Sequence, residues 1–309
     1  LLSILNESIK LLPKNGKLMA FIALYSLALS STIFLLFNYS MEFVINDNAN
    51  KIMKKVMPDL TSFNTADPNN ITPETAAFLA YKIISLVREY SALIFAVQIP
   101  FLFVLFIIFF FSSISTILVS SISYSSKKSS LNEVFSIILN IWKGPMVTVL
   151  YVSALATGYA LFVFTWAAPL LLYPSIITYC LATLVAVFAL FLYSYLFVSW
   201  AMAIVVSVLE EGCFGLEALG RGEKLVSGKK LDGFLINVGF NVVCSIVFWG
   251  CNKMVFVVGV SCLGKILTDV VYTVLYLRCR VENGEEIELR RGVDYSKLPT
   301  NAQLGNEMA

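Results

Sequence analysis

Two opposite charges inside a long apolar stretch, Lys265 and Asp269, are the residues of this sequence best suited to chemistry. A charge at the centre of a bilayer costs about 2.5 to 3.5 kcal/mol on insertion scales, so such residues usually face the protein interior and pair. A spacing of four residues places both on one side of a helix. Three interpretations stay open: an ion- or proton-coupled site, a structural ion pair, or a helix end at Lys265.

Enzymatic chemistry has little support elsewhere in the chain. There is no histidine, which removes the commonest general base and a frequent zinc ligand. The six cysteines occur singly, without a CxxC pair, which favours packing roles. Glu210 and Glu211 follow an apolar segment directly, and we expect them to pair with Arg221 or Lys224 rather than to catalyse. We therefore expect no enzyme, no catalytic residue, no metal and no cofactor.

The elements that position these residues are predicted to lie in lipid. The chain is 58% hydrophobic and only 14% charged, whereas soluble domains carry about 25% charged residues. A helix needs about 20 apolar residues to cross the bilayer core. The sequence predicts an all-α polytopic transmembrane bundle of six helices, at 18–37, 92–120, 145–167, 174–208, 233–249 and 254–277. These form a single domain over 1–280, with an outer loop at 38–91 and a polar cytoplasmic tail at 281–309.

The distribution of Lys and Arg predicts the orientation. Fifteen of them flank the spans on the side of the two termini, against six on the other side. Both termini are therefore expected in the cytoplasm, with the protein in the endoplasmic reticulum, another endomembrane or the plasma membrane. Asn70, in the triplet Asn70-Ile71-Thr72 of the outer loop, is a candidate glycosylation site. The net charge of +2 gives no support for a nucleic-acid partner.

Amphipathic segments precede several of the spans. Ser130 and Glu133 have the spacing of a capping box, and the helix that follows carries Phe135, Ile138 and Trp142 on a predicted apolar face at the membrane interface. The N-terminal segment and residues 214–226 show the same pattern, the latter more weakly. We expect two or three cytoplasmic interfacial helices. A surface helix followed by two spans then occurs three times, which indicates either a degenerate repeat or the common placement of amphipathic helices beside basic loops.

Three blocks of residues resemble a known family. They are Ser113 to Thr116 with Tyr124, Lys127 and Trp142-Lys143; Leu209-Glu210-Glu211 with Gly215, Ala218-Leu219, Leu225-Val226 and Gly228-Lys229; and Tyr276 to Arg280 before an acidic tail. In this order they resemble uncharacterised six-span plant membrane proteins. The second block is also similar to the membrane domain of some bacterial glycerophosphodiester phosphodiesterases. The resemblance implies a fold and a membrane location but no activity. Arg280 stands where that pattern has Lys, and the tail lacks its His.

Together these features predict a non-enzymatic integral membrane protein that organises lipids or partner membrane proteins, in membrane organisation, biogenesis or trafficking. The expected partners are membrane lipids and, as a second class, other membrane proteins. The alternative function is a small-solute or ion transporter that uses the intramembrane pair of Lys265 and Asp269.

Overall fold

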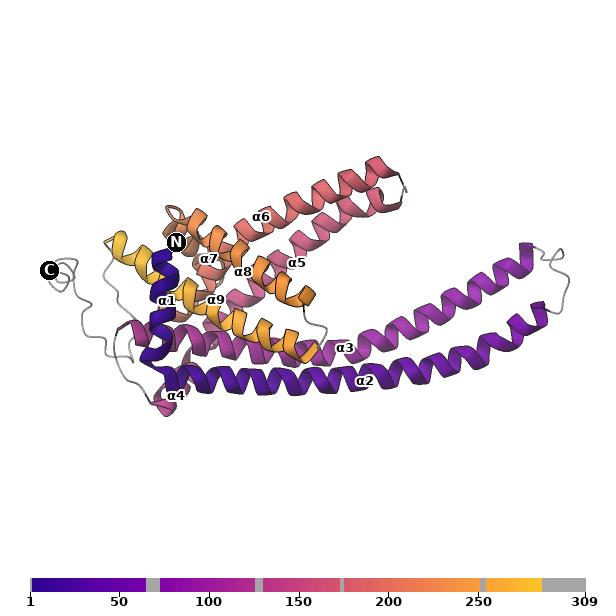
Figure 1. The fold of residues 1–309 in the computed structure, drawn as a ribbon, viewed down its shortest axis with the longest axis horizontal. Helices are drawn as coiled ribbons and strands as arrows, with labels where there is room; N and C mark the ends of the chain where they lie inside the picture. The colour runs from indigo at the N-terminus through magenta and orange to yellow at the C-terminus, as the bar shows by residue number, and fades with distance from the viewer. Residues whose placement is uncertain (1, 65–72, 126–129, 173–174, 251–253, 285–309) are drawn as a thin grey trace. The chain divides into compact units, whose positions relative to one another are not determined.

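All regular structure in the described part of the chain is helical (Figure 1). The structure is a computed structural model that describes residues 2–64, 73–125, 130–172, 175–250 and 254–284. Its helices are α1 (Leu2–Lys14), α2 (Gly16–Asn64), α3 (Pro73–Tyr124), α4 (Leu131–Ile141), α5 (Lys143–Leu172), α6 (Ile176–Leu209), α7 (Leu216–Val226), α8 (Lys230–Gly250) and α9 (Met254–Glu282).

Six of these helices are long and apolar enough to cross a membrane. The candidate spans are Gly16–Asn46, Phe95–Tyr124, Lys143–Leu170, Ile176–Leu209, Lys230–Gly250 and Phe256–Glu282. Each overlaps one of the six spans predicted from the sequence, so the predicted class, an all-α bundle with six membrane-spanning helices, is confirmed. Helices α1, α4 and α7 are the short helices, and each directly precedes a pair of spans.

The segment predicted as the outer loop, 38–91, is largely helical. Helix α2 continues to Asn64, and α3 begins at Pro73, a residue type that favours the first position of a helix. No Gly or Pro occurs between span 1 and Pro58, so the first helix meets no stop signal there. Several residues used in the sequence analysis lie outside the described residues: Asn70, Lys127 and the tail beyond 284.

The described chain divides into two compact units. The smaller unit is Ala28–Phe109 and contains α2 from Ala28 onward and α3 up to Phe109. Within it, the rings of Phe37 and Phe101 meet edge to face with their centroids 5.5 Å apart. The larger unit contains all the other helices, and every candidate site residue that the structure describes belongs to it.

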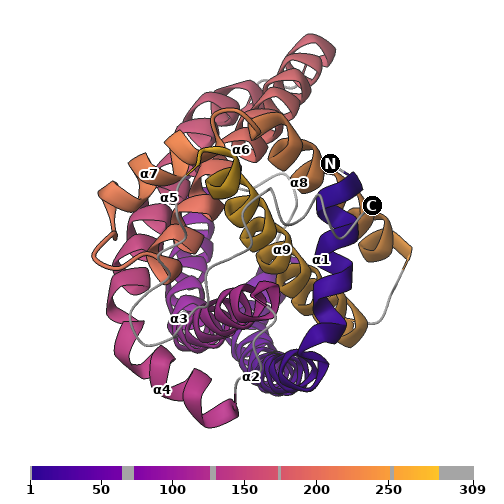
Figure 2. The same ribbon diagram turned by 90° about the vertical axis from the view of Figure 1, so that its left-hand side faces the viewer.

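In the larger unit the buried core gathers at one end of the spans. The buried residues of α6 all lie between Val198 and Leu209, whereas its earlier residues are exposed or half-buried. Buried residues of α3 from Phe110 onward and of α9 from Cys262 onward belong to this region, as do residues of α1, α4 and α7. Figure 2 faces this end of the unit, with α1, α4 and α7 arranged around it.

Two glycines allow α7 and the segment before it to pack closely. A Cβ on Gly222 would lie 2.8 Å from the backbone nitrogen of Ala203, so α7 approaches the backbone of α6 directly. Gly215, which precedes α7, has φ +64°, a conformation that favours glycine. Its N–H donates to Oγ1 of Thr148 on α5 at 2.8 Å. The surface helix α7 is therefore fixed to both α5 and α6.

Candidate functional site

Lys265 and Asp269 form an ion pair on α9. The ammonium Nζ of Lys265 lies 3.2 Å from Oδ2 of Asp269, and it also donates to Oγ of Ser113 on α3 at 2.5 Å. The two charged side chains retain 40% and 16% of their surface exposed. Because α9 runs unbroken from Met254 to Glu282, the interpretation of Lys265 as a helix end is wrong. The pair joins α9 to α3 while staying partly open.

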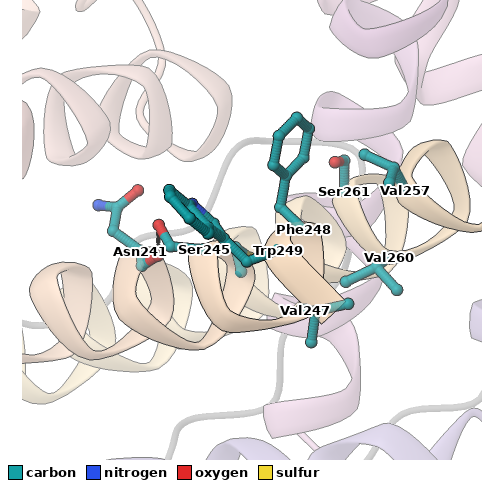
Figure 3. A pocket seen from close by; sticks show the side chains of 9 residues that line it. Asn241, Ser245, Val247, Phe248, Trp249, Val257, Val260 and Ser261 are labelled. Atoms are coloured by element: carbon teal, nitrogen blue, oxygen red, sulfur yellow. Dashed lines mark hydrogen bonds between the residues drawn. The ribbon is translucent and has the colours of Figure 1, made fainter. Parts of the chain in front are cut away.

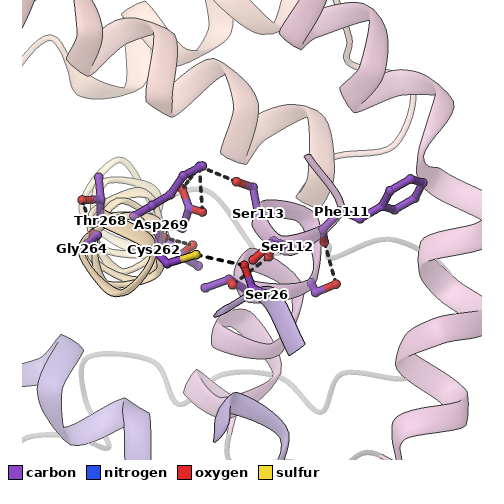
Figure 4. A network of polar contacts seen from close by, with 12 residues as sticks. Ser26, Phe111, Ser112, Ser113, Cys262, Gly264, Thr268 and Asp269 are labelled. Carbon is purple, nitrogen blue, oxygen red and sulfur yellow. Dashed lines mark hydrogen bonds and ion pairs between the residues drawn. The ribbon is translucent and has the colours of Figure 1, made fainter. Parts of the chain in front are cut away.

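Small polar side chains surround this pair (Figure 4). Ser26 on α2 and Cys262 on α9 meet with 3.4 Å between Oγ and Sγ. Thr268 donates to the carbonyl of Gly264 at 2.8 Å, one turn back in its own helix. Such bonds satisfy hydroxyl groups within the helix, as hydrocarbon surroundings require. The arrangement can hold α2, α3 and α9 together, and it brings a cation and an anion to one place in the span.

Helix α4 has three distinct sides. Its core side, buried in the protein, consists of Val134, Ile138 and Ile141. At about 100° per residue, the adjacent outer apolar side is exposed and consists of Leu131, Phe135 and Leu139. The third, polar side is exposed and consists of Asn132, Glu133, Ser136 and Asn140. The exposed apolar side thus lies between the side that packs on protein and the side suited to water.

The three residues predicted as one interfacial face are distributed between these sides. Phe135 is 64% exposed, Ile138 is 4% exposed in the core, and Trp142 is half-buried beyond the end of α4. Helical periodicity identifies the apolar arc, but it does not tell which part of that arc the rest of the protein covers. The predicted capping box is confirmed: Glu133 N–H donates to Oγ of Ser130 at 3.3 Å, and Ser130 N–H to Oε2 of Glu133 at 3.1 Å.

Helices α1 and α7 repeat the three sides of α4 in the same rotational order. The core sides consist of Ile4, Ser8 and Leu11 in α1 and of Ala218, Gly222, Leu225 and Val226 in α7. The outer apolar sides consist of Leu2, Leu5, Ile9 and Leu12 in α1 and of Leu216 and Leu219 in α7. The polar sides consist of Ser3, Asn6, Glu7 and Lys10 in α1 and of Glu217, Arg221 and Lys224 in α7. Glu223 interrupts the outer apolar side of α7, which is the weakest of the three.

A second charged cluster lies where α6 ends. Glu210, which caps α6, accepts hydrogen bonds from Oη of Tyr276 at 2.8 Å and from Nε of Arg221 at 3.2 Å. Nη1 of Arg280 lies 3.8 Å from Oε1 of Glu210 and donates to Oη of Tyr276 at 3.0 Å. The side chains of Glu210 and Arg280 are only 14% and 8% exposed. This Glu210–Arg280 cluster connects α6, α7 and α9.

The cluster unites two motifs that are far apart in the sequence. The expected pairing of Glu210 with Arg221 is present. The sequence does not predict its other two partners, Tyr276 and Arg280. Tyr276 is separated from Glu210 by 66 residues, so no local spacing reveals the contact. Charges at span ends ordinarily lie in water, and the sequence gives no sign that Arg280 is buried. Only the quoted resemblance points to both segments, because Glu210 and Tyr276 to Arg280 belong to two of its three blocks.

An arginine of α9 fixes α1 in place. Arg278 donates to Glu7 through two of its guanidinium nitrogens, Nε to Oε2 at 2.8 Å and Nη2 to Oε1 at 2.6 Å. It also donates to Oγ of Ser3. A bidentate arginine–carboxylate pair is among the stronger polar contacts and defines orientation. The polar side of α1 is therefore tied to the end of α9, which sets the direction of its outer apolar side.

Helix α7 has a further polar attachment through Glu223. The carboxylate of Glu223 accepts hydrogen bonds from Lys230 of α8 and from Ser199 of α6. The bond from Lys230, followed by that from Ser199, lowers the pKa of Glu223 below its ordinary range. Nearby, burial raises the pKa of the Cys213 thiol, which disfavours the thiolate form that a nucleophile needs. The contacts of Glu223 therefore hold α7 to α6 and α8.

A small groove lies between α8 and α9 (Figure 3). It has a volume of about 220 Å³ and is bordered by Asn241, Ser245 and Phe248 of α8 and by Val257 and Ser261 of α9, among others. The Asn241 amide donates to the Asn237 carbonyl at 2.9 Å, and Ser245 donates to the Asn241 carbonyl at 2.7 Å. Neither Lys265 nor Asp269 borders this groove.

Comparison with known proteins identifies the family. No curated protein matches the chain, and no solved structure does. One family model, described as a domain of unknown function (DUF8558), matches residues 1–290. The match includes every helix described above, with the surface helices and both charged clusters. This chain therefore belongs to the DUF8558 family.

Proposed function

We propose that this protein is a non-enzymatic integral membrane protein that organises the lipids of one leaflet through its surface helices. The observation that carries the proposal is the outer apolar side of α4, where Leu131, Phe135 and Leu139 are 48%, 64% and 53% exposed. Such a side next to the start of a span has lipid as its natural neighbour. Partner membrane proteins that meet the same side are the second class of target, and the setting is membrane organisation, biogenesis or trafficking.

Topology supports the participation of all three surface helices. Two spans separate α1 from α4, and two more separate α4 from α7. Because two crossings return the chain to the side from which it started, the three helices share one side of the membrane. Their common order of core, outer apolar and polar sides is then the order expected of helices that lie between protein, lipid and water. The shared order of the three sides in α1, α4 and α7 also favours a threefold repeat of one unit, a surface helix followed by two spans.

Orientation and location are part of the same proposal. The excess of Lys and Arg on the side of the termini favours a cytoplasmic position for both ends and for α1, α4 and α7. The membrane would be the endoplasmic reticulum, another endomembrane or the plasma membrane. Kinship with the six-span plant proteins, and with the membrane domain of bacterial phosphodiesterases, is proposed from the quoted motifs alone.

Quenching by brominated lipids tests the contact directly. The four native tryptophans are replaced by phenylalanine, and a single tryptophan is introduced as Phe135→Trp. The matched control is Ser136→Trp, which lies on the polar side of the same helix. Position 135 should be quenched strongly by bromines near the top of the acyl chains, and position 136 weakly. Equally weak quenching at both positions, in variants that keep their helix content, would contradict lipid contact.

The alternative function is transport of a small solute or ion through the pair of Lys265 and Asp269. It is favoured by the 40% exposure of the Lys265 side chain and by the contact with Ser113 of a different span. In liposomes with a trapped pH dye, a proton-coupled transporter would show a flux that Lys265→Met and Asp269→Asn abolish without loss of insertion. Our proposal expects no such flux from the unaltered protein.

A further inference from the structure

We infer that this protein favours curved membrane, convex on the side that carries α1, α4 and α7. The inference rests on the proposed function, in which these helices lie in lipid. If α1, α4 and α7 lie in lipid on one side of the membrane, their apolar side chains add volume to that leaflet only. The geometry behind it is an asymmetry between the two ends of the larger unit, visible in the connections, in the exposed side chains and in the position of the core.

Within the larger unit, the connections between spans differ on the two sides, whereas the long connection at 47–94 belongs to the smaller unit. On the surface-helix side, an eleven-residue helix precedes α5 and another precedes α8, and the thirteen-residue α1 precedes α2. On the opposite side, only residues 173–175 join α5 to α6, and only residues 251–253 join α8 to α9. Polypeptide beyond the spans is thus concentrated at one face of the larger unit.

The outer apolar sides place this extra volume at a particular depth. An amphipathic helix at the interface buries its apolar side about 5 to 10 Å into the boundary between headgroups and acyl chains. The neighbouring polar side keeps α4 from sinking further, and the core side holds it against the bundle. In α1, the bidentate bond from Arg278 to Glu7 fixes the same arrangement. Each helix therefore spreads the headgroups of that leaflet without adding area to the other.

The packing of the spans differs between the same two ends of the larger unit and fixes the surface helices at one of them. In α6, residues from Val198 to Leu209 are buried among neighbouring helices, whereas Ile176, Leu184 and Phe188 near its other end are 83%, 68% and 69% exposed. The larger unit is therefore closely packed where the surface helices gather, and its helices have few protein neighbours where the α5–α6 connection lies.

Membrane tubes pulled from giant vesicles provide the test. The full-length protein, labelled at its C-terminus, is reconstituted in phosphatidylcholine without charged lipids, so that electrostatic attraction does not contribute. A membrane-impermeant quencher distinguishes molecules whose C-terminus faces outward from those facing inward. The outward population should have a tube-to-flat density ratio above one, and the inward population a ratio below one. A ratio of one for both populations would overturn the inference.

Two sets of variants show whether the outer apolar side is responsible. The combined changes Leu131→Ser, Phe135→Ser and Leu139→Ser should lower the outward ratio toward one, while α1 and α7 keep their own apolar sides. The matched control on the polar side combines Asn132→Ala, Ser136→Ala and Asn140→Ala and should keep the ratio of the unaltered protein. If the first set leaves the enrichment unchanged, α4 is not its cause and the inference fails. Strong quenching at position 135 without any curvature preference would leave the proposed function standing and overturn this inference alone.

Discussion

The two charged clusters on α9 differ in how much of the protein each one joins. Lys265 and Asp269 belong to the same helix and reach one further span through Ser113. The Glu210–Arg280 cluster connects the end of α6, the surface helix α7 and α9. The first pair has 40% and 16% of its side-chain surface exposed, against 14% for Glu210 and 8% for Arg280 in the second. The more deeply buried cluster is therefore also the more widely connected one.

The pair of Lys265 and Asp269 is therefore the more conspicuous feature of the sequence, whereas the Glu210–Arg280 cluster joins more elements of the fold. A lysine in the middle of an apolar span attracts attention, yet its partner is its own neighbour one helical turn away. The glutamate at the end of α6 has an ordinary sequence context, yet it binds partners on two other helices, α7 and α9. If burial and connectivity determine how much a cluster contributes to stability, the Glu210–Arg280 cluster should contribute more than the pair of Lys265 and Asp269. Four experiments test the polar and close contacts that hold the larger unit together.

The largest effect is expected from Glu210→Gln. This change removes the negative charge beside buried Arg280, and breaking a buried ion pair typically costs about 3 to 5 kcal/mol. The matched control is Glu211→Gln, because Glu211 is exposed and exposed ion pairs contribute about 0 to 1 kcal/mol. Reversible unfolding in bicelles, followed by circular dichroism, gives both values. Similar losses of unfolding free energy for Glu210→Gln and Glu211→Gln would show that the Glu210–Arg280 cluster contributes no more to stability than an exposed carboxylate.

A smaller loss is expected from Asp269→Asn, about 1 to 3 kcal/mol, because partly exposed Lys265 loses its counter-charge in the span. The double variant Lys265→Met, Asp269→Leu should recover most of this loss, since an apolar pair needs no compensation. A double-mutant cycle of these variants and Lys265→Met, measured by the same reversible unfolding in bicelles, gives the coupling energy between Lys265 and Asp269. A loss for Asp269→Asn that exceeds the loss for Glu210→Gln would reverse the ranking of the two clusters.

The close approach of α7 to α6 gives the third prediction. Gly222→Ala places a methyl group against the backbone of Ala203, and such overpacking usually costs about 1 to 3 kcal/mol. Gly220→Ala in the same helix meets nothing within 4 Å and should stabilise α7 by up to about 1 kcal/mol. Arg221 lies between the two glycines, so only the first change should also weaken the Glu210–Arg280 cluster. Equal behaviour of the two alanine variants would show that α7 is not held tightly on α6.

The smallest effect is a dependence of stability on pH through Glu223. Its pKa is lowered in the folded protein, first by the hydrogen bond from Lys230. The ionised carboxylate therefore stabilises the fold above the ordinary pKa of 4.5, and this contribution is lost as the pH falls through the lowered folded value. Glu223 is half exposed, so solvent screening keeps the contribution small. Unfolding midpoints below pH 5 should fall less steeply for Glu223→Gln than for the unaltered protein.

Local physics explains what the sequence predicts well. Six spans, the capping box at Ser130 and the helix start at Pro73 depend on composition and on spacings of a few residues. The approach of Lys265 to Asp269 is likewise a matter of one helical turn. Each of these features is determined by residues close together in the chain, so a single sequence is sufficient to find it.

Tertiary packing explains what the sequence does not predict. Ile138 and Phe135 have the same apolar character and lie near one another on α4, yet one is buried and the other exposed. Only the position of α4 on the bundle distinguishes them. The approach of Arg280 to Glu210, and of Arg278 to Glu7, likewise depends on how distant helices meet. No spacing within one sequence contains this information.

The concentration of the core at one end of the larger unit has a consequence for how the sequence tolerates change. From Ile176 to about Leu192, α6 exposes apolar side chains and contributes none to the buried core. Substitutions there need only preserve hydrophobicity and helix length, because lipid accepts any apolar shape. Natural variants should therefore accumulate in that half of α6, whereas the residues around Val198 to Glu210 should change little. A chimera that receives the outer half of the α5–α6 hairpin from an unrelated membrane protein should still fold.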